Sequence, residues 1–178
     1  PCYNEEQRLN VQAFSSFVDN WSDINFLFVD DGSRDGTWKI LEQLTGAYRG
    51  RISAKRLEQN SGKAEAVRLG MLAAAQSLDN QYPVSSYVGF WDADLATPLQ
   101  DIPAFLEVFS VRPSIDMVFG ARVKLLGHAV KRNPLRHYLG RIFATVASNM
   151  LKIGIYDAQC GGKIFRNNPE LSEICSEP

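Results

Sequence analysis

Apolar residues follow two alternating patterns along this chain. In short segments they come almost without interruption, and in longer segments they recur every three or four positions. The first pattern predicts strands and the second predicts helices. The run Ile-Asn-Phe-Leu-Phe-Val at 24–29 is typical of a strand in a parallel sheet that is covered on both faces. The predicted strands are 24–29, 51–57, 86–91, 116–120 and 163–166.

Helical segments alternate with these strands. At one helix start, Thr97 can cap, Pro98 suits the first helical position and Gln100 can complete a capping box. Repeated strand–helix units predict an α/β fold, Rossmann-like, with a mostly parallel sheet flanked by helices. Ligands of such sheets bind beyond the carboxyl ends of the strands. The predicted helices are 5–21, 36–44 and 62–78, with three more that begin near 97, 133 and 168.

Length and composition indicate one globular domain over 1–178. The chain is 45% hydrophobic and 22% charged, which excludes disorder, and its net charge of −1 gives no indication of nucleic-acid binding. Three cysteines without metal-ligand spacing indicate reduced thiols, and no run of 18 apolar residues is present. Pro1 opens directly into a turn-like segment, so we expect a fragment of a longer protein whose first strand lies outside it.

Charge is distributed unevenly. The segment 122–152 holds seven Lys or Arg and no Asp or Glu, whereas the other residues hold 12 basic against 20 acidic side chains. Such a segment can be a solvated basic face, an anion site or a surface for an anionic membrane. The apolar stripe of the helix expected from 133 can equally well be membrane-facing or part of the core.

Asp92-Ala93-Asp94 is the strongest candidate for chemistry. Two carboxylates at the end of an apolar strand can converge on a hard divalent cation such as Mg²⁺ or Mn²⁺. Such an ion would neutralise charge on a leaving diphosphate. The alternative is an ordinary solvated turn.

Two further motifs also follow predicted strands. A carboxylate of Asp30 or Asp31 can accept hydrogen bonds from a nucleobase or a ribose, although an Asp-Gly turn explains the segment too. In Asn60-Ser61-Gly62-Lys63, the backbone N–H groups and Lys63 can hold an anion at a helix start, and an ordinary helix cap is the simpler explanation. Cys160 lacks a Cys/His arrangement for a nucleophile.

The order of four motifs resembles that of the family 2 glycosyltransferases, which have the GT-A fold. The motifs are Pro1-Cys2-Tyr3-Asn4-Glu5-Glu6, Asp30-Asp31-Gly32-Ser33, Asn60-Ser61-Gly62-Lys63 and Asp92-Ala93-Asp94. Each is weak alone, but together they lie at the family's spacing through nearly the whole chain.

Within that family, the chain is most similar to the dolichyl-phosphate β-glucosyltransferase branch. The similarity lies in Leu95-Ala96-Thr97-Pro98, Gly120-Ala121-Arg122 and Asp157-Ala158-Gln159-Cys160-Gly161. The related mannosyltransferases tend to have Gln-His-Pro after Asp-Ala-Asp-Leu and Thr-Ser-Gly-Phe-Arg in the later loop. The departure from both patterns favours UDP-glucose over GDP-mannose.

The resemblance implies roles for matching residues. The nucleoside would lie among Pro1, Tyr3, Glu5, Asp30 and Asp31, with Lys63 on the donor side. The metal and the donor phosphates would lie at Asp92, Ala93 and Asp94, with Asp94 the direct ligand. Arg122 and Arg132 would face phosphate groups, and Asp157 would be a base or a positioning group. The catalytic set would be Asp94, Arg122, Arg132 and Asp157.

The reaction implied is inverting transfer of a hexose from UDP-glucose to a polyprenyl or dolichyl phosphate, at the cytoplasmic face of a membrane. A lipid phosphate is already an anion and needs no general base, whereas a sugar hydroxyl does. Alternatives are transfer to a glycan hydroxyl, a GDP-mannose-dependent polyprenyl-phosphate mannosyltransferase, and a nucleotide-sugar-binding domain without turnover. A nucleotidyltransferase would typically have a Gly-rich, basic N-terminal loop, which this chain lacks. The C-terminal acceptor-side region is expected to lie outside this sequence.

Overall fold

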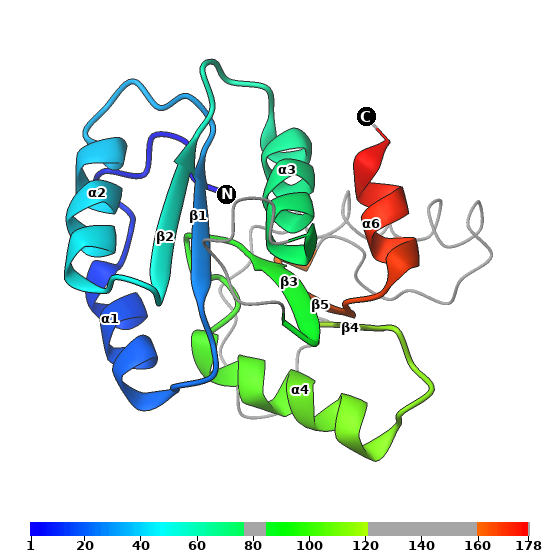
Figure 1. Ribbon diagram of the computed structural model, residues 1–178. Coiled ribbons are helices and arrows are strands. Elements are labelled where there is room, and N and C mark those ends of the chain that lie inside the picture. The colour runs from blue at the N-terminus through cyan, green and yellow to red at the C-terminus, as the bar shows by residue number, and fades with distance from the viewer. Residues whose placement is uncertain (77–84, 121–159, 178) are drawn as a thin grey trace, which may run out of the picture.

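The computed structural model describes residues 1–76, 85–120 and 160–177 (Figure 1). The five predicted strands are present within two residues of their expected bounds. The strands are β1 (Phe26–Asp30), β2 (Ile52–Arg56), β3 (Tyr87–Trp91), β4 (Met117–Phe119) and β5 (Gly162–Arg166). The helices are α1 (Val11–Asn20), α2 (Thr37–Ala47), α3 (Lys63–Gln76), α4 (Ile102–Val111) and α6 (Pro169–Ser176), with a 3₁₀ turn at Leu99–Asp101. The helix expected from 133 lies outside the described residues.

The strands form two hydrogen-bonded groups. β1 and β2 are parallel, and a parallel bridge joins Cys2 to Asp30 at the end of β1. In the second group, β5 lies between β3 and β4 and is antiparallel to both. The α/β fold with a parallel sheet flanked by helices is confirmed, and the direction of β5 is a feature that the apolar pattern did not predict.

Helices cover both faces of β1 and β3. On one face, α3 packs against both strands, and a Cβ added at Gly70 would lie 2.9 Å from Val29. On the other face, the Phe14 ring of α1 makes edge-to-face contacts with Phe26 (5.3 Å) and Phe28 (4.9 Å). Alternate side chains of a strand point to opposite faces of the sheet. Because helices cover both faces, odd- and even-numbered side chains are both shielded, and the strands are therefore apolar along their length.

The predicted helix 5–21 is wrong in its first turns. α1 begins only at Val11, where the Asn10 side chain accepts a hydrogen bond from the Ala13 N–H (3.0 Å). Upstream of it, the Glu5 N–H donates to Thr37 Oγ1 (2.7 Å) instead of entering a helix. A long-range contact therefore overrides the local helical pattern.

The capping box predicted at Thr97 is also wrong. Pro98 is extended, with ψ of 143°, and α4 starts after the 3₁₀ turn. Thr97 is buried, and its carbonyl accepts a hydrogen bond from Trp91 Nε1 (2.7 Å). Thr97 therefore anchors the segment after β3 rather than a helix.

The described helices include none with the length and apolar character needed to cross a membrane.

Candidate functional site

The first two sequence motifs are bonded to each other at the carboxyl end of β1. The Asn4 N–H donates to Ser33 Oγ (3.0 Å), and the Arg34 N–H donates to Asn4 Oδ1 (2.9 Å). Asn4 has a φ of 52°, a left-handed conformation that Asn tolerates better than most residues. The segment around Tyr3 and Glu5 is thus held against the turn that follows β1, and the Tyr3 side chain stays exposed.

Asp30 is wholly buried within this turn. Its Oδ1 accepts a hydrogen bond from the Ser33 N–H (3.1 Å), and its Oδ2 is paired with Arg56 Nε (3.2 Å). Arg56 lies beside Asp30 in the parallel register of β1 and β2. Sequence reasoning missed Arg56, although a cation at the end of the neighbouring predicted strand was a signal for it.

Asp31 connects the second motif to the third. Its carboxylate is 2% exposed and accepts hydrogen bonds from the Ser61 N–H (2.7 Å) and the Gly62 N–H (2.9 Å). Gly62 has a φ of 94°, a backbone conformation that L side chains rarely adopt. The sequence indicated that these N–H groups could hold an anion, and in this structure the anion they hold is the protein's own Asp31.

Lys63 connects the third motif to the fourth. Its Nζ lies 2.5 Å from Asp92 Oδ1, at the carboxyl end of β3. The Asp92 N–H donates to the Gly161 carbonyl (2.8 Å), and the Asp92 carboxylate lies directly over Gly161, where a Cβ would overlap it. Ala93 is buried.

Asp94 is the exposed carboxylate of the fourth motif. Its Oδ1 accepts a hydrogen bond from the Ala96 N–H (3.0 Å). The following residue, Leu95, has a φ of 53°, which costs an L residue without a local side-chain hydrogen bond roughly 1–2 kcal/mol. Strain of this kind persists only where surrounding contacts impose it.

Glu5 brings the first motif close to the fourth. Burial raises the pKa of Glu5, Arg8 opposes that rise, and the negative charge of Asp94 adds to it. Glu5 Oε1 is bonded to Arg8 (2.9 Å), whereas its Oε2 is buried without a hydrogen-bond partner in the described structure. The four motifs therefore meet at one edge of the fold.

The carboxylates of Asp92 and Asp94 suit a hard divalent cation that keeps part of its coordination shell for other ligands. Within 1–76, 85–120 and 160–177, no three His, Cys, Asp or Glu side chains form a metal-binding group. The chain thus offers Asp92 and Asp94, and Mg²⁺ is commonly held by one or two carboxylates together with waters and substrate phosphates. The unpartnered oxygen of Glu5 adds negative charge nearby.

The remaining predicted residues are placed as follows. Pro1 is half-buried beside the bridge between Cys2 and Asp30. Arg122, Arg132 and Asp157 lie outside the described residues. Cys160 is buried with its Sγ 3.6 Å from Thr97 Oγ1.

Solved structures with this arrangement are glycosyltransferases of the GT-A fold. A mannosyltransferase from Pyrobaculum calidifontis, in complex with GDP-Man and Mn²⁺, matches 93% of this chain and 42% of its own, with a TM-score of 0.51 and 18% identity. The glucosyl-3-phosphoglycerate synthase of Mycobacterium tuberculosis, in complex with phosphoglyceric acid, matches 94% of this chain and 55% of its own, with a TM-score of 0.56 and 19% identity. The fold is therefore GT-A, as expected.

The family model for glycosyl transferase family 2 matches residues 1–170. This chain belongs to glycosyl transferase family 2.

The curated relatives share similar levels of sequence identity with this chain. An uncharacterised protein of Methanocaldococcus jannaschii is 29% identical over 93% of this chain and 69% of its own length. The dolichyl-phosphate beta-glucosyltransferase of Dictyostelium discoideum is 29% identical over 93% of this chain and 52% of its own. A dolichyl-phosphate beta-glucosyltransferase of Trichomonas vaginalis is 27% identical over the whole chain and 56% of its own. The chain thus spans about half the length of the relatives that bear this name.

Replacing Gly161 by alanine tests the placement of Asp92. The new Cβ would overlap the Asp92 carboxylate and push it from its position, so we expect Mn²⁺ affinity to fall by about tenfold or more. Calorimetric titration with Mn²⁺ alone measures the loss. Gly46→Ala is the matched control, because a Cβ there meets nothing within 4 Å, and its Mn²⁺ affinity should equal that of the parent chain. Unchanged affinity in a folded Gly161→Ala chain would exclude Asp92 as a ligand.

Replacing Lys63 by methionine tests whether the ammonium competes with a cation. The Lys63 side chain is 59% exposed, so its pair with Asp92 contributes only about 0.2–1 kcal/mol. Removing the charge should therefore raise Mn²⁺ affinity by up to roughly fivefold in the absence of nucleotide. Electron paramagnetic resonance of free Mn²⁺ gives the affinity, with exposed Lys39→Met as control. Weaker Mn²⁺ binding in Lys63→Met alone would contradict the competition.

Proposed function

We propose that this chain carries the donor-binding part of an inverting hexosyltransferase that moves glucose from UDP-glucose to a polyprenyl or dolichyl phosphate. The observation that carries the proposal is that the four motifs are linked at one edge of the fold. The Asp31 carboxylate accepts hydrogen bonds from the loop before α3, and Lys63, which follows that loop, pairs with Asp92. The relatives named dolichyl-phosphate beta-glucosyltransferase support the acceptor class.

On the donor side, each part of the edge has a role. Exposed Tyr3 offers a ring for the nucleoside, with Pro1 and Glu5 beside it. Asp30 and Asp31 act on the nucleoside side by fixing the turn after β1 and the loop before α3, since both carboxylates already hold protein groups. Lys63 lies where it can face a donor phosphate.

Asp92 and Asp94 would hold Mg²⁺ or Mn²⁺. When bound, the cation neutralises negative charge on the departing diphosphate. Asp94, the more exposed of the two, is the direct ligand, and Asp92 is held in place by Gly161 and Lys63.

Transfer to a lipid phosphate needs positioning more than proton removal. A phosphate oxygen of the acceptor forms a bond to C1 of the sugar, the C1–O bond to UDP breaks, and UDP leaves with the electron pair, so no proton moves. The acceptor needs cations to hold it near the donor diphosphate. The basic segment 122–152, with Arg122 and Arg132, offers them, and Asp157 would position the acceptor. The same segment would rest on the cytoplasmic face of a membrane.

A GDP-mannose-dependent transferase is the second candidate, since one structural neighbour is a mannosyltransferase in complex with GDP-Man and Mn²⁺. Calorimetric titration with UDP-glucose, GDP-mannose and UDP-N-acetylglucosamine, each with and without Mn²⁺, separates the candidates. We expect Mn²⁺-dependent binding of UDP-glucose at least about tenfold tighter than that of the other two. Preference for GDP-mannose would move the assignment to the mannosyl branch.

Replacing Asp94 by alanine tests catalysis. Removing the direct ligand should lower turnover with UDP-glucose and a polyprenyl phosphate by roughly 10²-fold or more, since the charge on the departing diphosphate loses its compensation. Transfer of radiolabelled glucose into lipid measures it. The control is Asp101→Ala, an exposed carboxylate seven residues further on that caps nothing, which should keep parental turnover. Parental turnover of Asp94→Ala in saturating Mg²⁺ would refute the metal assignment.

A further inference from the structure

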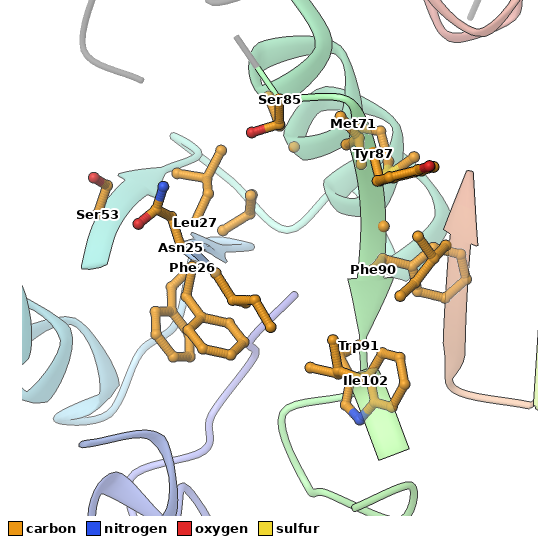
Figure 2. Close-up of a pocket in the computed structure, with 18 of the residues that line it drawn as sticks. Asn25, Phe26, Leu27, Ser53, Met71, Ser85, Tyr87, Phe90, Trp91 and Ile102 are labelled. Atoms are coloured by element: carbon orange, nitrogen blue, oxygen red, sulfur yellow. The ribbon is translucent and has the colours of Figure 1, made fainter. Parts of the chain in front are cut away.

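Two cavities lie beside β1, and their walls differ in chemistry. The larger, of about 690 Å³, lies between β1 and β3 and is lined largely by apolar side chains such as Leu27, Phe90 and Ile102 (Figure 2). The smaller, of about 450 Å³, lies beyond the carboxyl ends of β1 and β2 and has Arg34 and Arg56 in its wall. Ligands of α/β sheets bind at that end of the strands. Arg56, to which the family resemblance assigns no role, therefore lies on the ligand-binding side of the sheet.

Arg56 holds both ends of the turn that follows β1. Its Nε lies 3.2 Å from Asp30 Oδ2 at the start of the turn, and its Nη2 donates to the Ser33 carbonyl (2.9 Å) at the end. The guanidinium also lies 5.6 Å from the centre of the Trp38 ring. A planar guanidinium makes such contacts in a fixed geometry that a single ammonium does not reproduce.

Asp30 needs this cation. Its carboxylate is wholly buried, and a buried charge is tolerated only when it is paired and hydrogen-bonded. The Ser33 N–H supplies one partner (3.1 Å) and Arg56 supplies the other. The Arg56 side chain is 44% exposed, so the turn is held from the interior by Asp30 and from the surface by Arg56.

The turn in its place positions two segments that the proposed function puts at the nucleoside. Ser33 Oγ accepts a hydrogen bond from the Asn4 N–H (3.0 Å), which fixes the segment that carries Tyr3. Asp31 belongs to the same turn and accepts a hydrogen bond from the Ser61 N–H (2.7 Å). A shift of the turn would therefore move both segments.

We propose that Arg56 is a positioning residue for the donor nucleoside, because it bonds Asp30 and the Ser33 carbonyl and so fixes the turn on which both segments rest. The identity of the ligand rests on the proposed function, whereas the contacts of Arg56 do not. Arg56 acts through the turn and not on the diphosphate. Its loss therefore weakens binding of the nucleoside and leaves binding of the diphosphate unchanged.

Replacing Arg56 by lysine tests this role. Lysine keeps a cation beside Asp30 but cannot hold Asp30 and the Ser33 carbonyl as the guanidinium does. Calorimetric titration measures the affinities for UDP, GDP and pyrophosphate, each with Mn²⁺. Pyrophosphate has no nucleoside and reports on the diphosphate side alone. We expect Arg56→Lys to bind UDP about tenfold more weakly than the parent chain and to bind pyrophosphate within about twofold of it.

Arg51→Lys is the matched control, because Arg51 makes contacts of the same kind at the amino end of β2. Its Nε donates to Asn25 Oδ1 (2.8 Å), directly before β1 and far from Asp30. Its Nη2 donates to the Trp21 carbonyl (2.5 Å) and the Ile24 carbonyl (2.8 Å). This control should lower the unfolding temperature by an amount similar to that of Arg56→Lys, with all three affinities unchanged.

Two results would overturn the proposal. One is an equal loss of UDP and pyrophosphate affinity in Arg56→Lys, which would show that Arg56 only stabilises the fold. The other is parental UDP affinity in a folded Arg56→Lys chain. If Arg56→Lys does not fold, Asp30→Asn combined with Arg56→Gln removes both charges of the pair together and carries the same expectations.

Amide hydrogen exchange separates this inference from the proposed function, since it needs no nucleotide. Arg56→Lys should speed exchange of the Ser33 and Asn4 amides by about tenfold, whereas Arg51→Lys should leave both unchanged. Unchanged exchange in Arg56→Lys would overturn the role of Arg56 even where the parent chain binds UDP. If the parent chain binds neither UDP nor GDP, the proposed function fails and the exchange rates alone decide whether Arg56 fixes the turn. If the parent prefers GDP, a loss of GDP affinity in Arg56→Lys supports the same role.

Discussion

The Asp31 carboxylate is the group on which the rest of the site depends. A buried carboxylate without partners would cost several kcal/mol, roughly the whole margin of a small domain. Asp31 avoids that cost by accepting hydrogen bonds from two consecutive N–H groups before α3. Because α3 begins at Lys63, these bonds also fix the start of the helix and so bring the Lys63 ammonium to Asp92.

The charges at the edge imply that the donor diphosphate of the proposed reaction would need cations beside it. Glu5, Asp92 and Asp94 gather there, where Arg8 is paired with Glu5 and Lys63 with Asp92. A donor diphosphate would add further negative charge. Burial first, and the negative charge of Asp94 in part, raise the pKa of Glu5, so the charged form of Glu5 is already disfavoured at this edge. A divalent cation at Asp92 and Asp94 would relieve this repulsion, and Lys63 relieves part of it in its absence.

The elements that follow from local pattern could be predicted from the sequence, and those that follow from long-range contacts could not. Apolar runs gave the strands, and the position of acidic residues at strand ends indicated a shared edge, because carboxyl ends of parallel strands meet. The helix start at Glu5 and the cap at Thr97 failed because tertiary hydrogen bonds to Thr37 and Trp91 outcompete local preference. The antiparallel direction of β5 depends on which strands are neighbours, and a single sequence gives no local signal for that. The pair between Arg56 and Asp30 depends on neighbouring strands too, although a cation near the end of the second predicted strand pointed toward it.

The contacts that assemble the edge join residues about one strand–helix unit apart. Asn4 meets Ser33 across 29 residues and Asp31 meets Ser61 across 30. None of these pairs can form before the strands and the intervening helices pack, so the site has no stability separate from the fold. The helix α3 matters most, since it starts at the edge and packs on both β1 and β3 through Gly70 and Met71. A change in its packing would shift Lys63 relative to Asp92, and the distance between the turn at Asp31 and the carboxylates after β3 would change with it.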